Sequence, residues 1–213
     1  MTDIRLLITG KMGSGKSFAA DYMVREHGAQ RWSRTELMKR LAHAVVDHSV
    51  PPDPILERIF TEPNEREQVR AELLEYGATY MIEPGKPRRL YQDVTEICQE
   101  FDPLCFEREL MQRIENSPAA DFCLIDDVRK LSAFEFFAAS GFNTLRIETP
   151  EELRLERIMN RDGYLPSEET FAHSSETELD QVEHEFTIQN DGDDLPAFYR
   201  SLDDLVETLR ASA

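Results

Sequence analysis

Cysteine is rare in this chain, and long hydrophobic runs are missing. The 213 residues include three cysteines, Cys98, Cys105 and Cys123, at irregular spacing and without a CxxC pair. This argues against a disulfide framework or a zinc site and indicates reduced thiols. No apolar run approaches the length of a membrane span, and the first residues do not combine a basic segment with an apolar one, as a secretion signal would. We therefore expect a cytoplasmic protein without a membrane partner.

Positive charge is also scarce. Lysine and arginine total 24 against 42 aspartate and glutamate residues, which gives a net charge of −18. From Glu151 onward the imbalance is steeper, with 5 basic and 17 acidic side chains. Such a surface repels polyanions, so we expect no nucleic-acid partner. The alternative is that the acidic surface only keeps the protein soluble.

Short apolar runs alternate with amphipathic segments along the chain. This alternation predicts an α/β fold with a parallel sheet, and the length suits one domain with a sizeable core. Thr149 and Pro150 predict a helix cap followed by a proline at the first helical position. We expect strands near 3–9, 30–32, 121–126, 143–148 and 185–188, helices over 17–27, 131–138, 150–162 and 195–209, and a helical stretch over 33–101 that prolines interrupt.

A glycine-rich segment follows the first predicted strand. Residues 10–17 read Gly-Lys-Met-Gly-Ser-Gly-Lys-Ser, which satisfies GxxxxGK[ST] between a strand and a helix, the context that a P-loop requires. The glycines let backbone N–H groups approach phosphate oxygens, and the helix N-terminus adds partial positive charge. Lys16 would reach the β- and γ-phosphates, and the Ser17 hydroxyl would hold Mg²⁺. The pattern predicts ATP as cofactor, bound by Gly10, Lys11, Met12, Gly13, Ser14, Gly15, Lys16 and Ser17.

Charged residues gather at the end of the strand predicted over 121–126. Asp126, Asp127 and Arg129 lie there, and doubly wound sheets bind their ligands at the carboxyl ends of strands. Adjacent carboxylates suit Mg²⁺, directly or through water, and Arg129 would grip a phosphate with two hydrogen bonds. The alternative is that the acidic pair caps the next helix.

Three arginines recur on the helix that precedes a polar segment. Arg154, Arg157 and Arg161 share one helical stripe, and residues 163–180 are loop-like. Kinases of small phosphorylated substrates close a lid over the phosphates, which excludes water and supplies cationic side chains. Otherwise the stripe would be a solvated face that pairs with neighbouring glutamates.

A basic cluster stands out in this acidic chain. Arg88 and Arg89 open a predicted helix, with Gln92 one turn beyond Arg88. The arginines would bind the phosphate of an acceptor and Gln92 a polar ring or ribose, although a plain surface turn has the same spacing. His173 and Glu176 are weaker candidates for substrate binding, because their segment also fits a helix capping box.

In their order along the chain, these elements resemble the phage-type deoxynucleoside monophosphate kinases, relatives of dephospho-CoA kinase and phosphomevalonate kinase. The resemblance covers most of the chain, and the P-loop is its specific element. Thr95 and Ala133 depart from the family pattern, both on the acceptor side. The matching elements are the P-loop, Arg88-Arg89-Leu90-Tyr91-Gln92, Asp127-Val128-Arg129, a strand before a proline-started helix, His173 to Glu176, and Ile188-Gln189-Asn190.

The resemblance implies a P-loop kinase fold within one domain, 1–213. Its parts are a core with a five-stranded parallel sheet flanked by helices (1–32, 118–162 and 181–213), a helical substrate-binding lobe (33–117) and a lid (163–180). It adds Asn190 to the cofactor-binding residues. Together, motifs and resemblance assign catalysis to Lys16, Asp127, Arg129, Arg157 and Arg161, further cofactor binding to Arg157 and Asn190, substrate binding to Arg88, Arg89, Gln92, Asp127, Arg129, His173 and Glu176, and metal binding to Ser17, Asp126 and Asp127.

We expect a phosphotransferase, monomeric or homodimeric, that uses ATP and Mg²⁺ to convert a deoxynucleoside monophosphate to the diphosphate. Three alternatives stay open: a kinase of another phosphorylated metabolite such as dephospho-CoA, a phage kinase acting on modified bases in DNA, and a nucleotide-binding module without turnover. A GTPase is not expected, because the chain has no NKxD motif.

Overall fold

The chain divides into two units, which we call the sheet unit (Met1–Trp32 and Ser117–Ala213) and the helical unit (Ser33–Asn116). The computed structural model describes residues 4–47, 51–82, 87–118, 121–165, 178–192 and 194–212. The helical unit has nearly the same bounds as the lobe expected over 33–117. That this unit binds the substrate stays a prediction.

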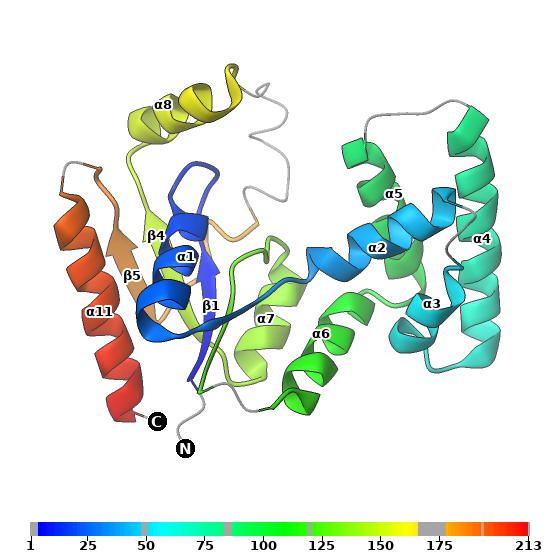
Figure 1. Cartoon of the computed structure of the whole chain (residues 1–213), viewed down its shortest axis with the longest axis horizontal. Coiled ribbons are helices and arrows are strands. Elements are labelled where there is room, and N and C mark those ends of the chain that lie inside the picture. The colour runs from blue at the N-terminus through cyan, green and yellow to red at the C-terminus, as the bar shows by residue number, and fades with distance from the viewer. Residues whose placement is uncertain are drawn as a thin grey trace. The chain divides into compact units, whose positions relative to one another are not determined.

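The sheet unit is built on parallel strands in the order β2-β3-β1-β4-β5 (Figure 1). This confirms the predicted α/β fold with a five-stranded parallel sheet. In the centre, β1 pairs with β3 and β4, so that Leu7 lies opposite both Ile125 and Thr144. The strands are β1 (Ile4–Thr9), β2 (Gln30–Trp32), β3 (Phe122–Ile125), β4 (Asn143–Glu148) and β5 (Phe186–Gln189).

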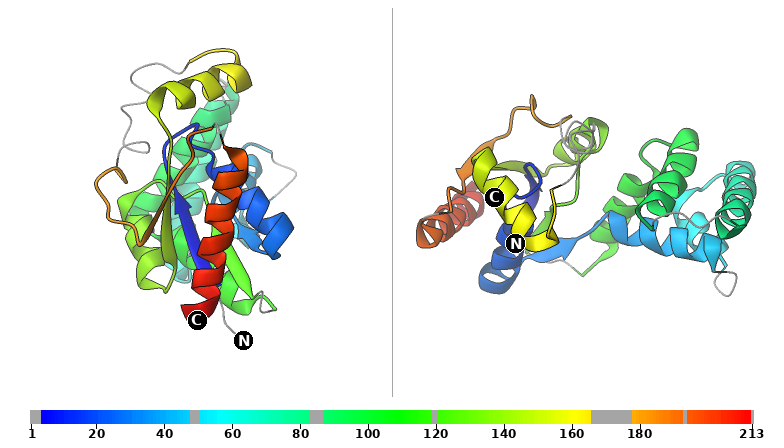
Figure 2. Two further views of the ribbon diagram at one scale, coloured as in Figure 1. Left: turned by 90° about the vertical axis from the view of Figure 1, so that its left-hand side faces the viewer. Right: turned by 90° about the horizontal axis from the view of Figure 1, so that it is seen from above.

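Helices cover both faces of this sheet, which explains why β1 reads as a nearly continuous apolar run. Side chains alternate across a strand, and Leu6 and Ile8 face a core shared with α1 (Lys16–His27) and α11 (Leu195–Ser212). The opposite face carries α7 (Leu131–Ala139), which contacts β1 (Figure 2).

The start of α8 (Glu151–Asp162) differs from the prediction. Pro150 is the N-cap residue and not the first helical residue, and no side chain caps this helix. The Thr149 hydroxyl instead donates a hydrogen bond of 3.0 Å to the carbonyl oxygen of Ser14. The Thr149 hydroxyl therefore bonds to the glycine-rich loop instead of capping its own helix. This hydrogen bond links the loop to the connection between β4 and α8.

The helical unit has its own apolar core, which includes Leu41, Leu56, Leu73 and Val94. Its helices α2, α4 and α5 pack against one another. A Cβ atom at Gly77 would lie 2.5 Å from the Val45 carbonyl oxygen, so glycine permits the close approach of α2 and α4. The helices are α2 (Thr35–Val46), α3 (Asp53–Ile59), α4 (Pro63–Ile82), α5 (Pro87–Phe101) and α6 (Cys105–Asn116).

The three cysteines are buried thiols. Cys98 and Cys105 lie in the helical unit and Cys123 on β3, and none forms a disulfide. Burial raises the pKa of Cys98 to about 12 and also raises that of Cys105. Neither thiol is therefore a thiolate at neutral pH.

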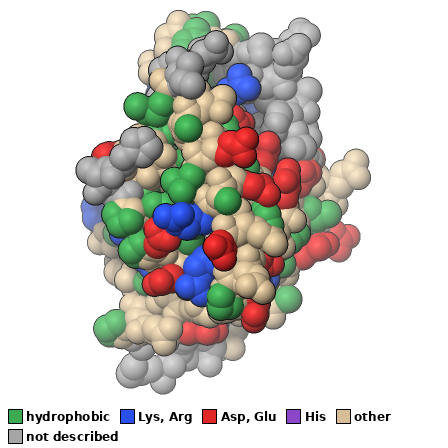
Figure 3. Space-filling model, turned by 90° about the vertical axis from the view of Figure 1, so that its right-hand side faces the viewer, with side chains coloured by type: hydrophobic (Ala, Val, Ile, Leu, Met, Phe, Trp, Pro, Cys, Tyr) green, Lys and Arg blue, Asp and Glu red, His purple; other side chains and the backbone are tan. Residues whose placement is uncertain are grey.

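The surface of the helical unit is polar. Figure 3 shows one of its sides, where acidic and basic side chains are interspersed with hydrophobic ones. On α4, Glu67, Glu72 and Glu75 are exposed. Among the described residues, no helix combines the length and apolar character that a membrane crossing demands.

Candidate active site

The glycine-rich segment forms a tight loop between β1 and α1, where the central strand ends. Gly13 and Gly15 have φ angles of 80° and 95°, in the left-handed region where other residues are strained. A Cβ atom at Gly13 would lie 2.7 Å from the Arg154 carbonyl oxygen, and one at Gly15 would collide with the side-chain nitrogen of Asn190. Backbone conformation and space therefore both require glycine at these positions.

Lys16 is the first residue of α1, and its side chain folds back over the loop. Its ammonium group donates hydrogen bonds to the carbonyl oxygens of Gly10 and, at 2.9 Å, Lys11. The N-cap of α1 is Gly15, without a side-chain cap and without an acidic residue in the first turn. Helix N–H groups and an ammonium group here combine to favour a bound anion.

The two loop serines differ in their surroundings. Ser17, in the first turn of α1, is exposed, whereas Ser14 is 1% exposed. The Ser14 hydroxyl oxygen has no hydrogen-bond partner among the described residues. Because buried polar atoms are normally hydrogen-bonded, a phosphate group or its bound water would supply what Ser14 lacks, so the loop fits a phosphate-bearing ligand.

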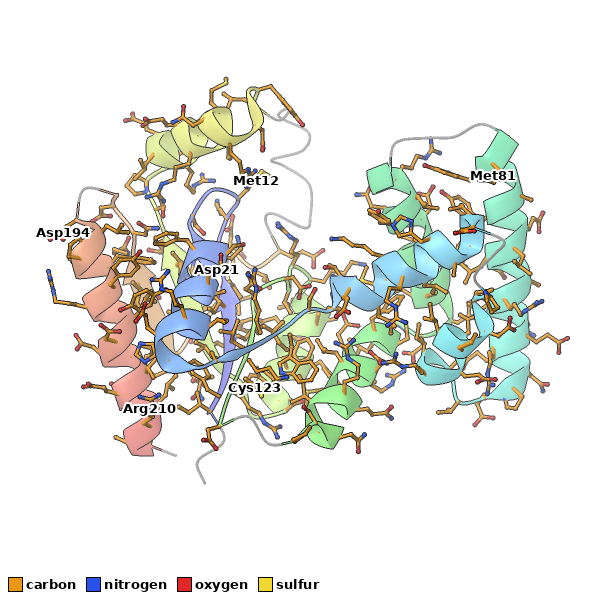
Figure 4. All side chains as sticks on the ribbon, in the orientation of Figure 1. Met12, Asp21, Met81, Cys123, Asp194 and Arg210 are labelled. Carbon is orange, nitrogen blue, oxygen red and sulfur yellow. The ribbon has the colours of Figure 1, made fainter. Side chains whose placement is uncertain are left out.

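Two of the three predicted arginines of α8 bind the loop backbone. In Figure 4, α8 crosses above the loop, whose tip is marked by Met12. Arg154 donates to the Met12 carbonyl oxygen at 3.2 Å, and Arg157 donates to that of Gly13 at 3.4 Å. Arg161 is exposed and pairs with its neighbour Asp162 at 2.7 Å. Of the three arginines, Arg161 therefore fits the alternative of a solvent-exposed, ion-paired side chain, and Arg154 and Arg157 do not.

Asn190 connects the end of β5 to the same loop. It is 5% exposed, its side-chain nitrogen donates to the Ser14 carbonyl oxygen at 2.9 Å, and its side-chain oxygen accepts from Arg157 at 3.1 Å. Burial lowers the pKa of Arg157, although the charge of Glu156 acts in the opposite direction. The two hydrogen-bond acceptors that Arg157 has among the described residues are uncharged, so this desolvated cation would gain from an anionic ligand.

The strand-end aspartates have different surroundings. Asp126 is 7% exposed, and both of its carboxylate oxygens accept hydrogen bonds from Arg31, at 2.8 and 2.6 Å. Asp127 is half-buried. The N–H group of Leu131, the first residue of α7, donates to the Glu178 carboxylate at 2.9 Å. Glu178 thus caps α7, a role that the alternative interpretation gave to the acidic pair. No cluster of three or more His, Cys, Asp or Glu residues in the described part of the chain would hold a metal by itself.

Several site residues were missed by sequence reasoning. The carboxylate of Asp180 lies 2.8 Å from the Lys11 ammonium and 3.1 Å from the Arg146 guanidinium. Burial alone would raise the pKa of Asp180, but these hydrogen bonds hold it below its ordinary value. The available signal was Arg146, a charged residue inside the β4 sequence. A hollow beside the P-loop is lined by Gly10, Lys11, Val128, Arg129, Arg146, Leu179 and Asp180.

His184 is the other missed residue. Its Nδ1 lies 2.9 Å from the Val182 carbonyl oxygen, which makes Nδ1 the donor, so Nε2 accepts from the Thr9 hydroxyl at 2.6 Å. Thr9 directly precedes the P-loop. Burial lowers the pKa of His184, helped by the charge of Arg146. This histidine therefore favours its neutral form and ties the segment before β5 to the end of β1.

Three of the predicted substrate-binding residues, Arg88, Arg89 and Gln92, belong to the helical unit. Arg89 and Gln92 are exposed on α5, and Arg89 lies 3.4 Å from Asp93. The side chain of Arg88 lies outside the described residues. So do His173 and Glu176, together with most of the segment expected to form the lid.

Solved structures of other proteins are similar to this chain. No family model matches the chain, and no curated protein matches it significantly. The crystal structure of TT1252 from Thermus thermophilus has a TM-score of 0.56 at 24% identity, over 98% of this chain and 99% of that one. Shikimate kinase from Acinetobacter baumannii, in complex with shikimate, has a TM-score of 0.48 at 14% identity, over 99% and 95% of the two chains. A sugar kinase from Janibacter has a TM-score of 0.48 at 12% identity, over 98% and 95%.

The likeness to TT1252 concerns the fold. Together with the strand order β2-β3-β1-β4-β5, it supports an α/β fold with a five-stranded parallel sheet, whose central strand β1 is followed by the glycine-rich loop.

Proposed function

We propose that the chain is a kinase that uses ATP and Mg²⁺ to phosphorylate a deoxynucleoside monophosphate to the diphosphate. The observation that carries this proposal is the convergence of positive charge on one glycine-constrained loop. Lys16 belongs to that loop, and Arg154 and Arg157 reach it from α8. A loop of this charge and shape suits a triphosphate.

Bound ATP supplies the phosphoryl group, and bound Mg²⁺ neutralises part of its charge. Ser17 and Asp127 would hold the metal, which proteins typically bind with one or two carboxylates together with phosphate oxygens. Lys16 and Arg157 would stabilise charge on the phosphoryl oxygens, because preorganised cations in a partly buried site need little rearrangement during the reaction. Arg129 and Arg161 are proposed to assist them.

Two observations support a deoxynucleoside monophosphate as the acceptor: the resemblance to the deoxynucleoside monophosphate kinases and the basic residues at the start of α5. Arg88 and Arg89 fall in the first turn of this helix, with Gln92 on the next turn. The Arg89 side chain is 76% exposed where it lies near the half-buried Asp93, and an ion pair with so exposed a partner is worth at most about 1 kcal/mol. Its arginine is therefore readily available to an incoming phosphate.

An acceptor panel tests the proposal. Purified protein with ATP and Mg²⁺ is given the four common deoxynucleoside monophosphates, their nucleosides, dephospho-CoA and duplex DNA, and ADP is measured while products are identified by mass. We expect diphosphates from one or more monophosphates and none from nucleosides, since a site built for a phosphate loses its partner when the phosphate is absent.

The other outcomes separate the alternatives. Turnover of dephospho-CoA alone would keep the reaction and replace the substrate. Phosphorylated DNA without phosphorylated mononucleotides would favour a DNA kinase. ATP binding without acceptor-dependent ADP would favour a non-catalytic module.

A further inference from the structure

Arg31, on β2, lies between carboxylates from two other elements. Its Nε and one terminal nitrogen donate to the two oxygens of Asp126 at 2.8 and 2.6 Å, and its other terminal nitrogen donates to Asp21 at 2.7 Å. This two-pronged geometry is the strongest arrangement that an arginine makes with a carboxylate. Arg31 thus occupies, with one positive charge, the space between two acidic side chains.

These partners stand next to the proposed metal ligands. Asp126 immediately precedes Asp127 at the end of β3, and Asp21 lies on α1 one helical turn after Ser17 (Figure 4). Arg31 itself is aligned with Leu124 in the pairing of β2 with β3. Burial alone would lower the pKa of Arg31, but its hydrogen bonds to Asp126 and the negative charges of Asp126, Asp21 and Asp127 raise it.

Exposure decides what each contact does. The Asp126 side chain is 5% exposed, so its charge requires a partner, whereas that of Asp21 is 67% exposed and its ion pair contributes little. The Arg31 side chain is 35% exposed, so water and ions can reach the position of its guanidinium group. Without Arg31, a buried carboxylate and an exposed one would face each other across a gap open to solvent.

We propose that Arg31 is a positioning residue that keeps Asp126 and Asp21 from binding the metal, so that Asp127 is the one strand-end carboxylate that holds Mg²⁺. The guanidinium group occupies both oxygens of Asp126 and repels a cation there. This proposal rests on the proposed function, since it concerns the same metal. A second metal at this position would draw Asp127 away from the phosphates.

Binding of Mn²⁺ to the protein without ATP, measured by electron paramagnetic resonance, tests the proposal directly. In Arg31→Gln the two carboxylates lose their internal cation, and we expect Mn²⁺ to bind at least roughly tenfold more tightly than in wild type, because affinity rises with the number of charged ligands. Arg25→Gln is the matched control. Arg25 is an exposed arginine on α1 that pairs with Glu26, so the net charge changes equally.

Three further variants separate positioning from folding. Arg31→Gln/Asp126→Asn should return Mn²⁺ binding to the wild-type level, and Arg31→Lys should keep it there, because the positive charge is retained. Asp126→Asn alone should leave Mn²⁺ binding in the presence of ATP within about twofold of wild type, whereas Asp127→Asn should weaken it. The Asp126→Asn measurement stands even if Arg31→Gln does not fold.

Two results would overturn the proposal. One is Mn²⁺ binding to Arg31→Gln that is no tighter than binding to Arg25→Gln. The other is an Asp126→Asn protein that loses Mn²⁺ as Asp127→Asn does, since Asp126 would then be a ligand. Failure of the proposed function shows itself differently, as wild-type protein that makes no diphosphate, and leaves the Mn²⁺ measurements without ATP interpretable.

Discussion

Arg157 and Asn190 are joined by a hydrogen bond of 3.1 Å beside the P-loop, and each also binds the backbone of the loop. Arg157 donates to the Gly13 carbonyl oxygen, and Asn190 donates to that of Ser14. The two residues come from α8 and from the end of β5, so elements from distant parts of the sequence set the shape of the loop. A loop held in this way needs little rearrangement to accept a phosphate, which favours binding.

Replacing Lys16 with alanine should abolish phosphoryl transfer and leave the fold intact. The ammonium group is proposed to stabilise charge on the transferred group, and the loss of one such contact typically costs a few kcal/mol, or about two or more decades in rate. Rates are measured by ADP formation and folding by circular dichroism. Lys39→Ala, which removes an exposed lysine from α2, is the control. Near-normal turnover in folded Lys16→Ala would contradict the P-loop assignment.

Gly13→Ala should impair ATP binding far more than Gly28→Ala. Both glycines have positive φ angles, 80° and 69°, so both substitutions strain the backbone by about 1 kcal/mol or more. Only the Cβ atom at Gly13 would meet a neighbour, at 2.7 Å from the Arg154 backbone, whereas nothing lies within 4 Å at Gly28. Calorimetric titration with ATP compares the two variants. Equal affinities would show that α8 does not constrain the loop.

Asn190→Ala should lower the stability of the protein and raise its KM for ATP. Arg157 would lose a hydrogen-bond acceptor, and the Ser14 carbonyl oxygen would lose one of its two donors and keep Thr149. The loss of a buried hydrogen-bond partner costs about 1–3 kcal/mol. Thermal unfolding and initial rates at varied ATP report the two effects. Asn160→Ala, on the exposed side of α8, should change neither. A variant that loses stability while keeping its KM would restrict Asn190 to a structural role.

His184→Gln should reduce the pH dependence of stability. Burial lowers the pKa of His184 in the folded state from its ordinary value of 6.5, so the unfolded chain binds the proton more readily. The histidine's contribution is therefore complete above pH 6.5 and is lost as the pH falls below it. Urea unfolding near neutral pH and about one unit below 6.5 measures the slope in each protein.

The control for this experiment is His43→Gln, which replaces an exposed histidine on α2. It shows what the loss of a histidine outside the sheet unit does to the same measurement. The same slope in wild type and His184→Gln would show that the bond between His184 and Thr9 does not depend on the neutral ring.

Hydrophobic patterning predicted β1, β3 and β4, because each of these strands carries several buried apolar residues. The strand expected over 143–148 is observed as Asn143–Glu148. The helical stretch predicted from this pattern ended at residue 101 and left out α6, which buries Glu107 and Glu109 beside its apolar residues. These glutamates pair with Arg34 and Arg58, contacts that a local pattern does not reveal.

The candidate site shows the same division. The P-loop is local in sequence, so its residues were identified from spacing alone. Arg31 and Asp126 lie 95 residues apart, and Thr9 and His184 lie 175 apart. Only the folded chain brings such pairs together, which is why Arg31, Asp180 and His184 were not predicted.

The burial of all three cysteines makes this protein well suited to site-specific labelling. Maleimides react with exposed thiolates, and Cys98, Cys105 and Cys123 are buried, with the pKa of Cys98 raised to about 12. One cysteine introduced at an exposed position of the helical unit and another in the sheet unit would therefore carry a pair of dyes without removal of the native residues. Energy transfer between those dyes would follow the distance between the two units while substrates bind.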